Sequence, residues 1–374
     1  MPREFSEAMS HPTRRSVLAA GLALPLALPK GGPEAARRGR AKRLLVLGGT
    51  RFLGPPIVEH ALAKGFEVTL FNRGKTDPKR FAQLEQRIGD RDRGDLEALK
   101  TGKWDAVIDT SGYAPAHVKA SAELLRDRVE QYLFVSTISV YASTAAAMVG
   151  EDTPVAKIDD ATAAQASTIQ EASRHYGAMK ARCEQAAETA MPGRVAQVRP
   201  GLIVGPEDNT DRFTYWPIRV GQGGEVLAPG NPDQEVQFID VRDLGEWCVR
   251  LCADKKFGVW NAVGLPMRLS IQELLHGCKV AQNADASFTW VAEKFLLENK
   301  VRAYTELPLW LPSGQRGHID NRRAIADGLL FRSVAETIRA TVAAFAKESP
   351  QGRVLRAGLS RERESALLEL WKKR

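Results

Sequence analysis

Short apolar runs alternate with stretches of helical spacing along much of the chain. The first such unit joins an apolar run at 44–47 to three glycines within 48–54, followed by a stretch of helical spacing at 57–64. An unbroken apolar run predicts a strand that is buried on both faces, and the spacing after the glycines predicts a helix. The turn between them has the form of a dinucleotide-binding turn, in which glycines leave room for phosphates where the helix starts.

The same alternation continues and predicts a parallel sheet. Further strands are predicted at 67–74, 86–90, 104–109, 131–135, 194–198 and 259–263. Further helices are predicted at 94–100, 115–128, 173–189 and 241–253. Strands that alternate with helices favour an α/β fold with a doubly wound parallel sheet of the Rossmann type. Ligands of such sheets bind beyond the carboxyl ends of the strands.

Two segments break the alternation. Residues 142–170 are rich in Ala, Thr and Asp, and we interpret them as a long surface excursion beside the site, a candidate lid. Residues 201–237 are rich in Gly, Pro and aromatic residues, which suits a pocket wall built from loops.

The patterns divide the chain into a Rossmann domain, a smaller lobe and two terminal segments. The predicted ranges are 1–40 for a leader and linker, 41–200 with 240–263 for the Rossmann domain, 201–239 with 264–346 for a substrate-binding lobe, and 347–374 for a helical tail.

The leader has the features of an export signal. Arg14 and Arg15 precede an apolar stretch that ends at Pro29 and is shorter than the roughly 20 residues of a membrane span. Paired arginines before such a stretch are typical of a twin-arginine signal, so we expect the twin-arginine translocase as a partner and a periplasmic or other extracytoplasmic location. The alternative is a disordered basic N-terminus. No small-x-small cleavage site is obvious before Gly31, which leaves an uncleaved, anchoring leader open.

Charge and cysteine content exclude some classes of function. Of the formal net charge of +8, residues 1–40 contribute half, through seven Arg and Lys side chains against three Glu. The rest is spread without a basic run, so no nucleic acid is expected as a partner. Cys183, Cys248, Cys252 and Cys278 lack the spacing of metal ligands, so no metal is expected.

Residues at the predicted strand ends are the candidates for holding a cofactor. The first turn contributes Gly48, Gly49, Thr50, Arg51, Phe52, Leu53 and Gly54, and the following strand ends contribute Asn72, Arg73, Asp90, Thr110 and Ser136. Because the ends of parallel strands meet at one edge of a sheet, we expect these residues to line one site.

Tyr176 and Lys180 are the candidate catalytic pair. Their spacing places both side chains on one face of the predicted helix. A phenol is a weak base because its pKa is about 10, and a nearby ammonium favours the phenolate and lowers that pKa. Thr137, which follows the strand at 131–135, can offer a hydroxyl to the same substrate oxygen.

With these residues in place, the chain resembles the short-chain dehydrogenase/reductase superfamily, in its extended NAD-dependent epimerase/dehydratase branch. The resemblance covers about 42–346. Residues 134–141 resemble the segment with the catalytic Ser or Thr, which falls on Thr137, and Tyr176 and Lys180 match the catalytic Tyr and Lys. Residues 199–206 and 237–244 resemble later landmarks of the branch, and Pro200 is counted with the cofactor-binding residues.

The resemblance implies a role for each of these side chains. Tyr176 would exchange the proton of a substrate hydroxyl as hydride passes to the nicotinamide. Lys180 would tune Tyr176 and hold the nicotinamide ribose, and Thr137 would orient the substrate oxygen. Asp90 would contact the adenine.

Two departures concern the cofactor, which is expected to be NAD or NADP. Arg51 replaces the usual middle glycine of the turn, as in a subgroup with G-G-T-x-F-x-G turns that includes RNA-associated relatives. Asn72, followed by Arg73, replaces the usual carboxylate at the end of the second strand. Because Arg accommodates a 2′-phosphate, the pair Arg51 and Arg73 favours NADP over NAD, with Arg73 as a solvated turn residue as the alternative.

A third departure concerns the reaction. Ile138 and Ser139 stand where dehydratases of the branch carry Asp-Glu, so elimination chemistry is disfavoured. An exported enzyme has no pool of reduced nicotinamide to draw on, which favours a redox-neutral, epimerase-like reaction on a sugar or glycoside hydroxyl. The alternatives are an NADPH-dependent reductase or dehydrogenase of a small carbonyl compound, and a non-catalytic relative that binds RNA or another ligand.

The substrate wall is expected within 211–216. Asp211, Arg212, Phe213 and Trp216 offer aromatic faces and an ion pair that suit a sugar-like small molecule, the alternative being that the aromatic residues form the lobe core. The resemblance also implies that a homodimer through helices is possible.

Overall fold

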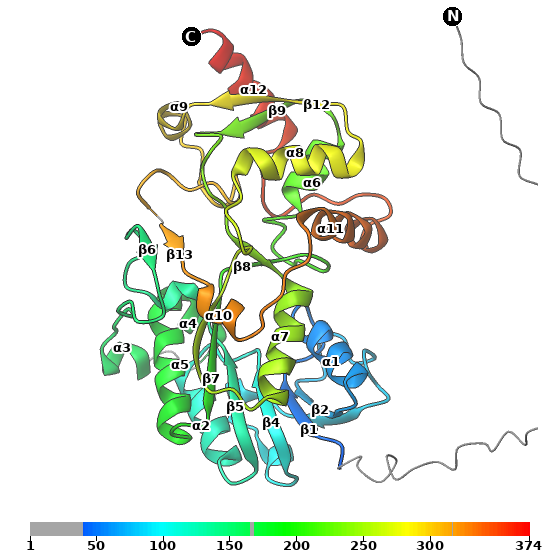
Figure 1. The fold of residues 1–374 in the computed structure, drawn as a ribbon, viewed down its shortest axis with the longest axis vertical. Helices are drawn as coiled ribbons and strands as arrows, with labels where there is room; N and C mark the ends of the chain where they lie inside the picture. The colour runs from blue at the N-terminus through cyan, green and yellow to red at the C-terminus, as the bar shows by residue number, and fades with distance from the viewer. Residues whose placement is uncertain (1–39, 165–167, 316) are drawn as a thin grey trace, which may run out of the picture. The chain divides into compact units, whose positions relative to one another are not determined.

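The computed structural model describes residues 40–164, 168–315 and 317–374. In these residues, seven parallel strands form the main sheet in the order β11-β7-β5-β4-β1-β2-β3 (Figure 1). They are β1 (Arg43–Leu47), β2 (Glu67–Asn72), β3 (Glu85–Ile88), β4 (Trp104–Asp109), β5 (Val129–Val135), β7 (Val195–Pro200) and β11 (Gly258–Ala262). The chain order reverses between β1 and β4, so the ligand crevice of such a sheet is expected at the carboxyl ends of these two strands.

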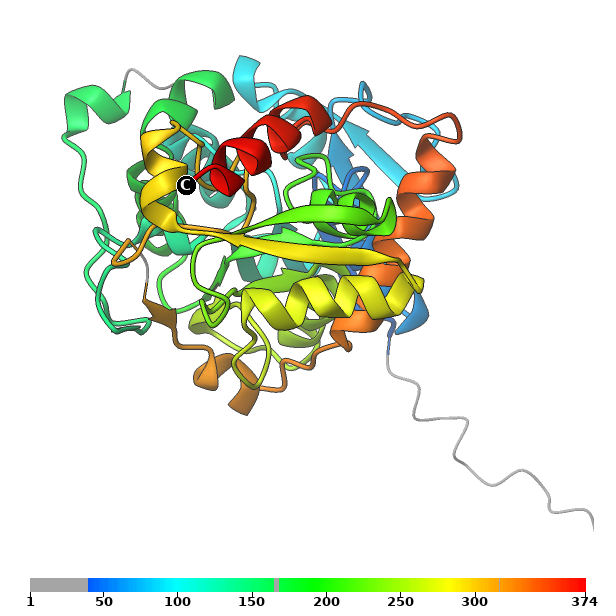
Figure 2. The same ribbon diagram turned by 90° about the horizontal axis from the view of Figure 1, so that it is seen from above.

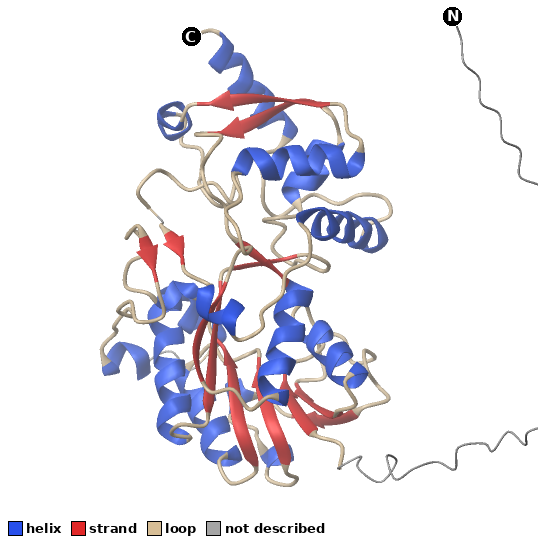
Figure 3. Ribbon diagram, in the orientation of Figure 1, coloured by secondary structure: helices blue, strands red, loops and turns tan. Residues whose placement is uncertain are grey.

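Helices cover both faces of this sheet (Figure 3). α1 (Gly54–Ala63) packs beside α7 (Val241–Ala253), and α2 (Pro115–Leu125) packs beside α5 (Tyr176–Ala190). The first pair shares a core that includes Ile57 and Trp247, and the second pair shares another that includes Val118 and Cys183. The predicted doubly wound parallel sheet is therefore confirmed.

Short elements fill the connections of the Rossmann domain. They are η2 (Arg91–Arg93), η3 (Glu97–Leu99), η4 (Ile138–Val140), β6 (Met148–Val149), α3 (Asp160–Ala164), α4 (Ile169–Ala172) and η5 (Ser173–His175). The helix predicted at 94–100 is wrong, because Gly94 has the left-handed φ of 68° and ends η2 before η3 begins. The excursion at 142–170 contains β6 and α3, and its role as a lid stays a prediction.

The second lobe has its own core. Its elements, with the links to the Rossmann domain, are β8 (Leu202–Val204), α6 (Tyr215–Gly221), β9 (Gly224–Pro229), β10 (Phe238–Asp240), α8 (Ile271–Gln282), β12 (Ala286–Val291), α9 (Glu293–Glu298), β13 (His318–Ile319), α10 (Arg322–Ala326), α11 (Val334–Glu348) and α12 (Arg361–Lys372). Figure 2 shows the paired strands β9 and β12 between α8 and α12. The wall predicted to be built from loops at 201–237 is thus wrong in part, since it contains β8, α6 and β9.

The predicted helical tail packs into the core of this lobe. Leu367 and Leu368 of α12 are buried among the lobe's apolar side chains. Glu364 is 1% exposed and accepts a hydrogen bond of 2.6 Å from Nε of Arg219 on α6. Leaving either member of a buried ion pair alone is strongly destabilising, so α12 is bound to the lobe by charge as well as by apolar contact.

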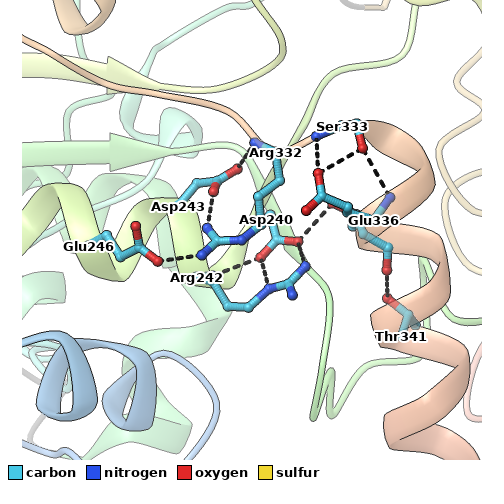
Figure 4. Close-up of polar contacts among 9 residues, drawn as sticks. Asp240, Arg242, Asp243, Glu246, Arg332, Ser333, Glu336 and Thr341 are labelled. Carbon is cyan, nitrogen blue, oxygen red and sulfur yellow. Dashed lines mark hydrogen bonds and ion pairs between the residues drawn. The ribbon is translucent and has the colours of Figure 1, made fainter. Parts of the chain in front are cut away.

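Ion pairs and hydrogen bonds join the lobe to the Rossmann domain where α7 and α11 begin (Figure 4). Arg332, just before α11, donates hydrogen bonds to Asp243 and Glu246 of α7. Thr337 of α11 donates a hydrogen bond of 2.7 Å to Asp240, whose carboxylate also caps α7. The two helix starts are therefore held together across the junction.

The described ranges contain neither a membrane-spanning helix nor a cluster of metal-ligating side chains. None of their helices has the length and apolar character needed to cross a bilayer. Within the same ranges, no three His, Cys, Asp or Glu side chains are grouped so as to hold a metal ion, and the four cysteines are free and buried. The predicted export signal lies outside the described residues.

Candidate active site

A cavity of about 480 Å³ lies at the carboxyl ends of the central strands. Tyr176 lines it, together with most of the residues predicted to hold a cofactor: Gly48, Gly49, Thr50, Arg51, Phe52, Leu53, Asn72, Arg73, Asp90, Thr110, Ser136 and Lys180. Ile203 and Asn209 line it from the segment that leads into the lobe. The structure thus brings the predicted strand ends together at one site, while Gly54, Thr137 and Pro200 lie outside the lining.

The glycine turn can only be built from residues without side chains. Gly48 and Gly49 have φ values of 113° and 98°, which disfavour other residues. A Cβ on Gly48 would lie 2.2 Å from Oγ1 of Thr110, and a Cβ on Gly54 would lie 2.4 Å from the backbone of Gly49. Gly54 therefore serves the close packing of α1 on the turn. Its own N–H donates to the carbonyl of Arg51, and Pro55 and Pro56 have no N–H, so the first turn of α1 offers no free amide to a phosphate.

Lys180 is buried beneath the cavity, one helical turn from Tyr176. Its ammonium donates hydrogen bonds of 2.8 and 2.7 Å to the carbonyl oxygens of Gly112 and Val135. It also lies 4.0 Å from the ring centroid of Phe134. Burial lowers the pKa of Lys180 to about 8.

The pKa of Tyr176 departs from the expected direction. More than a third of its surface, 37%, is exposed, but desolvation of its phenol and the neighbouring Tyr113 raise its pKa to about 12. A hydrogen bond with Thr137 and the charge of Arg212 act in the opposite direction. The predicted lowering by Lys180 is not seen, since the ammonium is directed to two backbone carbonyls instead.

The end of β5 supplies two hydroxyls beside this pair. Oγ1 of Thr137 accepts a hydrogen bond of 3.1 Å from the backbone N–H of Ser139 and so caps η4, and it also contacts Tyr176. Oγ of Ser136 is buried at the cavity and has no hydrogen-bond partner within the described part of the chain. A ligand in the cavity would satisfy it.

A buried ion pair under the cavity was not predicted from the sequence. Arg91 donates hydrogen bonds of 2.8 and 2.9 Å to the two carboxylate oxygens of Asp109, which also accepts one of 2.8 Å from Tyr132. Burial alone would raise the pKa of Asp109, but the charge and hydrogen bonds of Arg91 hold it below the usual range. Both residues stand at strand ends, which is the signal that could have found them.

The other end of the cavity carries the residues relevant to the choice of nucleotide. Asn72 donates to Gln86 at 3.0 Å and accepts from the backbone N–H of Gly74 at 2.8 Å, so its side chain holds the turn. The Arg73 side chain is 46% exposed and lies 3.9 Å from a carboxylate oxygen of Asp92. Asp90 caps η2 and lies 3.6 Å from Nζ of Lys75.

An ion pair links the two loops beside the cavity. Arg80, in the loop that follows β2, donates hydrogen bonds of 2.6 and 3.0 Å to the two carboxylate oxygens of Glu207. Glu207 belongs to the loop between β8 and α6 and has a φ of 62°, in the left-handed region. Residues 73–76 of the first loop and Asn209 of the second line the cavity, so this pair ties its two sides together.

Three of the four residues predicted for the substrate wall are in the lobe core. Phe213, Trp216 and Asp211 have no exposed surface. Trp216 donates a hydrogen bond of 2.7 Å to the carbonyl of Pro308, and Asp211 pairs with Arg353 at 2.5 and 2.7 Å. A substrate cannot reach them, so the alternative that the aromatic residues form the core is correct. Arg212 is only half-buried.

Two further residues of the cavity, Tyr113 and His117, were not predicted from the sequence. Tyr113 has its ring centroid 6.5 Å from that of Tyr176, and His117 on α2 is buried with Nε2 at 3.5 Å from Asp92. Both line the cavity. Tyr113 follows Gly112 in the turn after β4, so the expectation that residues after strand ends line the site applies to it as well.

Comparison with known proteins gives a family match. Residues 44–262, more than half of the chain, match the family described as the NAD dependent epimerase/dehydratase family. The chain is also similar to the chloroplast stem-loop binding protein of 41 kDa b of Arabidopsis thaliana, with 25% identity over 233 residues, 58% of this chain and 56% of that protein. The chain therefore spans little more than half the length of this curated relative.

Solved structures of similar fold include several epimerases. A putative epimerase from Burkholderia cenocepacia has 20% identity and a TM-score of 0.60, over 82% of this chain and 99% of that one. The enzyme WbmH of Bordetella bronchiseptica, solved with NAD+, has 16% identity and a TM-score of 0.59, over 82% and 99%. The UDP-N-acetylglucosamine 4-epimerase of Methanobrevibacter ruminantium, solved with UDP-N-acetylmuramic acid, has 16% identity and a TM-score of 0.61. The match covers 83% of this chain and 100% of that one. At these identities the likeness shows the fold.

Proposed function

Because the chain belongs to the NAD dependent epimerase/dehydratase family, we propose that it is an epimerase-like enzyme acting on a hydroxyl of a sugar or glycoside by short-chain dehydrogenase chemistry. The observation that carries this proposal is the placement of Tyr176 and Lys180 in the same cavity as the glycine turn. A binding protein that had merely kept the fold would need no such pair.

The cavity fits a nicotinamide dinucleotide. Within the described residues, Oγ of Ser136 is a buried hydroxyl at the cavity without a hydrogen-bond partner, and Gly48 and Gly49 line the cavity with no side chain of their own. The turn at 48–53 would hold the pyrophosphate, Lys180 the nicotinamide ribose and Asp90 the adenine side. Such a cofactor supplies reversible acceptance of hydride from a carbon.

Tyr176 is the residue that moves the proton. As a carbon is oxidised, the phenolate form of Tyr176 would take the proton of its hydroxyl, and the phenol so formed would return that proton to the same oxygen when hydride comes back. A pKa of about 12 keeps Tyr176 protonated near neutral pH, which is the form that donates in the second step. Thr137, hydrogen-bonded to Tyr176, is placed to orient the substrate oxygen.

A redox-neutral cycle requires that the cofactor stay bound between its two half-reactions. The pair of Arg80 and Glu207, which joins the loops on either side of the cavity, supports retention. Retention in turn suits a protein that is exported, as the paired Arg14 and Arg15 suggest. Recovery of the protein in the extracytoplasmic fraction of cells supports export, and recovery only in the cytoplasm contradicts it.

The form of the cofactor depends on Arg51 and Arg73. Both line the cavity. The guanidinium of Arg73 is 3.9 Å from a carboxylate oxygen of Asp92, too far for a hydrogen bond, so both arginines are available to a 2′-phosphate. This supports NADP as the proposed cofactor, whereas WbmH, of similar fold, was solved with NAD+.

The test is to identify what the purified protein carries and whether Tyr176 uses it. Denaturation is expected to release NAD or NADP, which mass spectrometry distinguishes. Tyr176→Phe is expected to keep the nucleotide but to lower turnover of a screened sugar at least about 100-fold, because general acid–base catalysis is lost. Tyr113→Phe, which removes the other phenol of the cavity, is the matched control. A protein without affinity for either nucleotide would overturn the proposal.

RNA binding is the second candidate, and the name of the Arabidopsis relative is the observation that favours it. Retarded migration of a stem-loop RNA with the purified protein at physiological salt would support it. RNA binding is the weaker candidate because the charge over 41–374 is spread evenly, without the basic run that a nucleic-acid site needs.

A further inference from the structure

The ion pair of Arg91 and Asp109 is nearly removed from solvent. The Asp109 carboxylate has no exposed surface, and only 8% of the Arg91 side chain is exposed. Taking two charges out of water costs free energy, and apolar side chains of similar volume are often at least as stable in such a place. A gain in stability is therefore a weak explanation for the pair, and its other hydrogen bonds point to a further role.

The pair fixes the turn that follows β4. Nη2 of Arg91 donates to Asp109 at 2.9 Å and also to Oγ of Ser111 at 2.6 Å. The Asp109 carboxylate accepts a hydrogen bond of 3.0 Å from the backbone N–H of Ser111. Ser111 is thus held through its side chain by Arg91 and through its backbone by Asp109. A Cβ on Gly112 would lie 2.9 Å from the carboxylate, so the chain passes directly over the pair at the next residue.

That next residue holds the ammonium of Lys180. The carbonyl oxygen of Gly112 accepts a hydrogen bond of 2.8 Å from Nζ of Lys180, and the carbonyl oxygen of Val135 accepts the other at 2.7 Å. Val135 is fixed by the sheet, since β5 pairs with β7 up to this residue. Gly112 lies outside any strand or helix, so the position of its carbonyl depends on the contacts of the turn.

We propose that Arg91 and Asp109 are positioning residues, which hold Lys180 in place for the reaction by fixing the turn between β4 and α2. This inference rests on the proposed function, because it takes Lys180 and Tyr176 as the reacting pair. A purely structural ion pair makes a different prediction: apolar side chains in its place would keep the fold and leave Lys180 where it is.

The experiment uses the ring current of Phe134 to measure where the ammonium lies. Nζ of Lys180 is 4.0 Å from the centroid of that ring, so the ring displaces the NMR signal of the adjoining Cε group upfield from the signals of exposed lysines. Full-length protein labelled with ¹³C at Cε of lysine gives this signal, and Lys180→Met assigns it by its loss. No nucleotide is added, and samples of equal nucleotide content are compared.

The main variant is Arg91→Met/Asp109→Leu/Tyr132→Phe, which replaces the pair and the phenol that donates to Asp109 by apolar side chains. Because such replacements are often neutral for stability, its urea midpoint is expected to stay near that of the wild type, while the displacement of the Lys180 signal falls to less than about half. Arg91→Lys keeps the charge but not the fork of donors that reaches Asp109 and Ser111 together, so an intermediate displacement is expected.

Arg219→Met/Glu364→Leu is the matched control, since it replaces a buried ion pair of the second lobe, and it is expected to keep the full displacement. An undiminished displacement in the folded main variant, or an equal loss in the control, would overturn the inference. Should the main variant fail to fold, Arg91→Lys decides, and an undiminished signal there overturns it as well.

The proposed function is judged separately, by the nucleotide that the protein releases. If nucleotide is released but the displacement persists in the variants, the proposed function stands and the positioning role fails. If the protein binds no nucleotide, the proposed function fails, and the signal of Lys180 still shows whether Arg91 and Asp109 hold it in place.

Discussion

At the scale of single residues, the site combines the buried ammonium of Lys180 with the phenol of Tyr176, whose pKa is raised. Lys180 is 3% exposed, and its ammonium contacts two carbonyl oxygens and two aromatic faces. Tyr176 is kept protonated by its surroundings. The ammonium of Lys180 is thus held in a form that costs free energy, and strongly shifted pKa values of this kind are typical of functional sites.

The Lys180 pKa predicts how stability changes with pH. Because the folded-state pKa of about 8 is below the unfolded value near 10.5, the folded protein binds fewer protons between these values. The free energy of unfolding is therefore expected to gain a few kcal/mol from Lys180 as the pH rises from 8 to 10.5, at roughly 1.4 kcal/mol per pKa unit.

Urea denaturation at several pH values checks this expectation by comparing the wild type with Lys180→Met. The thiols of Cys248, Cys252 and Cys278 titrate alike in both proteins, so the difference between the two curves reports Lys180 together with Cys183, whose pKa the Lys180 charge lowers. If the free energy of unfolding depends on pH in the same way in both proteins, folding does not lower the pKa of Lys180.

At the scale of elements, two loops from different lobes determine access to the cavity. The loop after β2 and the loop between β8 and α6 come from separate parts of the chain and meet through Arg80 and Glu207. The bidentate contact fixes both loops, since a guanidinium and a carboxylate share two parallel hydrogen bonds. Exchange of a ligand from the cavity is expected to need this contact to open.

Glu207→Gln is expected to speed nucleotide release several-fold, because the amide cannot keep the charged pair across the cavity. Stopped-flow displacement of bound nucleotide measures the rate. Glu130→Gln, which breaks an exposed pair with Lys255 outside the cavity, is the control. An unchanged release rate in Glu207→Gln would mean that the loops do not limit exchange.

At the scale of the whole folded unit, 41–374, two cores are joined by partly exposed ion pairs and a buried hydrogen bond. One lobe is the doubly wound sheet, and the other is organised around β9, β12 and their helices. Arg332 and Thr337 connect them at the starts of α7 and α11. The C-terminal helix α12 belongs to the second core, so the lobe depends on the last residues of the chain.

Glu364→Ala is expected to lower the free energy of unfolding by about 3–5 kcal/mol, because it leaves Arg219 buried without its charge partner. Chemical denaturation measures the loss. Glu369→Ala, on the exposed face of the same helix, is expected to change it by less than about 0.5 kcal/mol. Similar values for the two variants would show that α12 is only loosely attached.

Local pattern was enough to predict the parallel sheet and one edge of the site. An apolar run predicted β4 and a helical spacing of apolar residues predicted α7, both with the observed bounds. Such patterns are informative because they reflect which face of an element is buried. The strand-end rule placed Asn72, Asp90, Thr110 and Ser136 at one cavity, because parallel strands all end at the same edge of the sheet.

Only the tertiary structure decided which side chains of the lobe face the cavity. In sequence, Asp211, Arg212, Phe213 and Trp216 look equally suited to a substrate, but all except Arg212 are buried in contacts with segments far away along the chain, such as Pro308 and Arg353. The ion pair of Arg91 and Asp109 likewise joins two distant segments, the turn after β3 and the end of β4. Local spacing does not encode such contacts, because they form only when distant segments pack against one another.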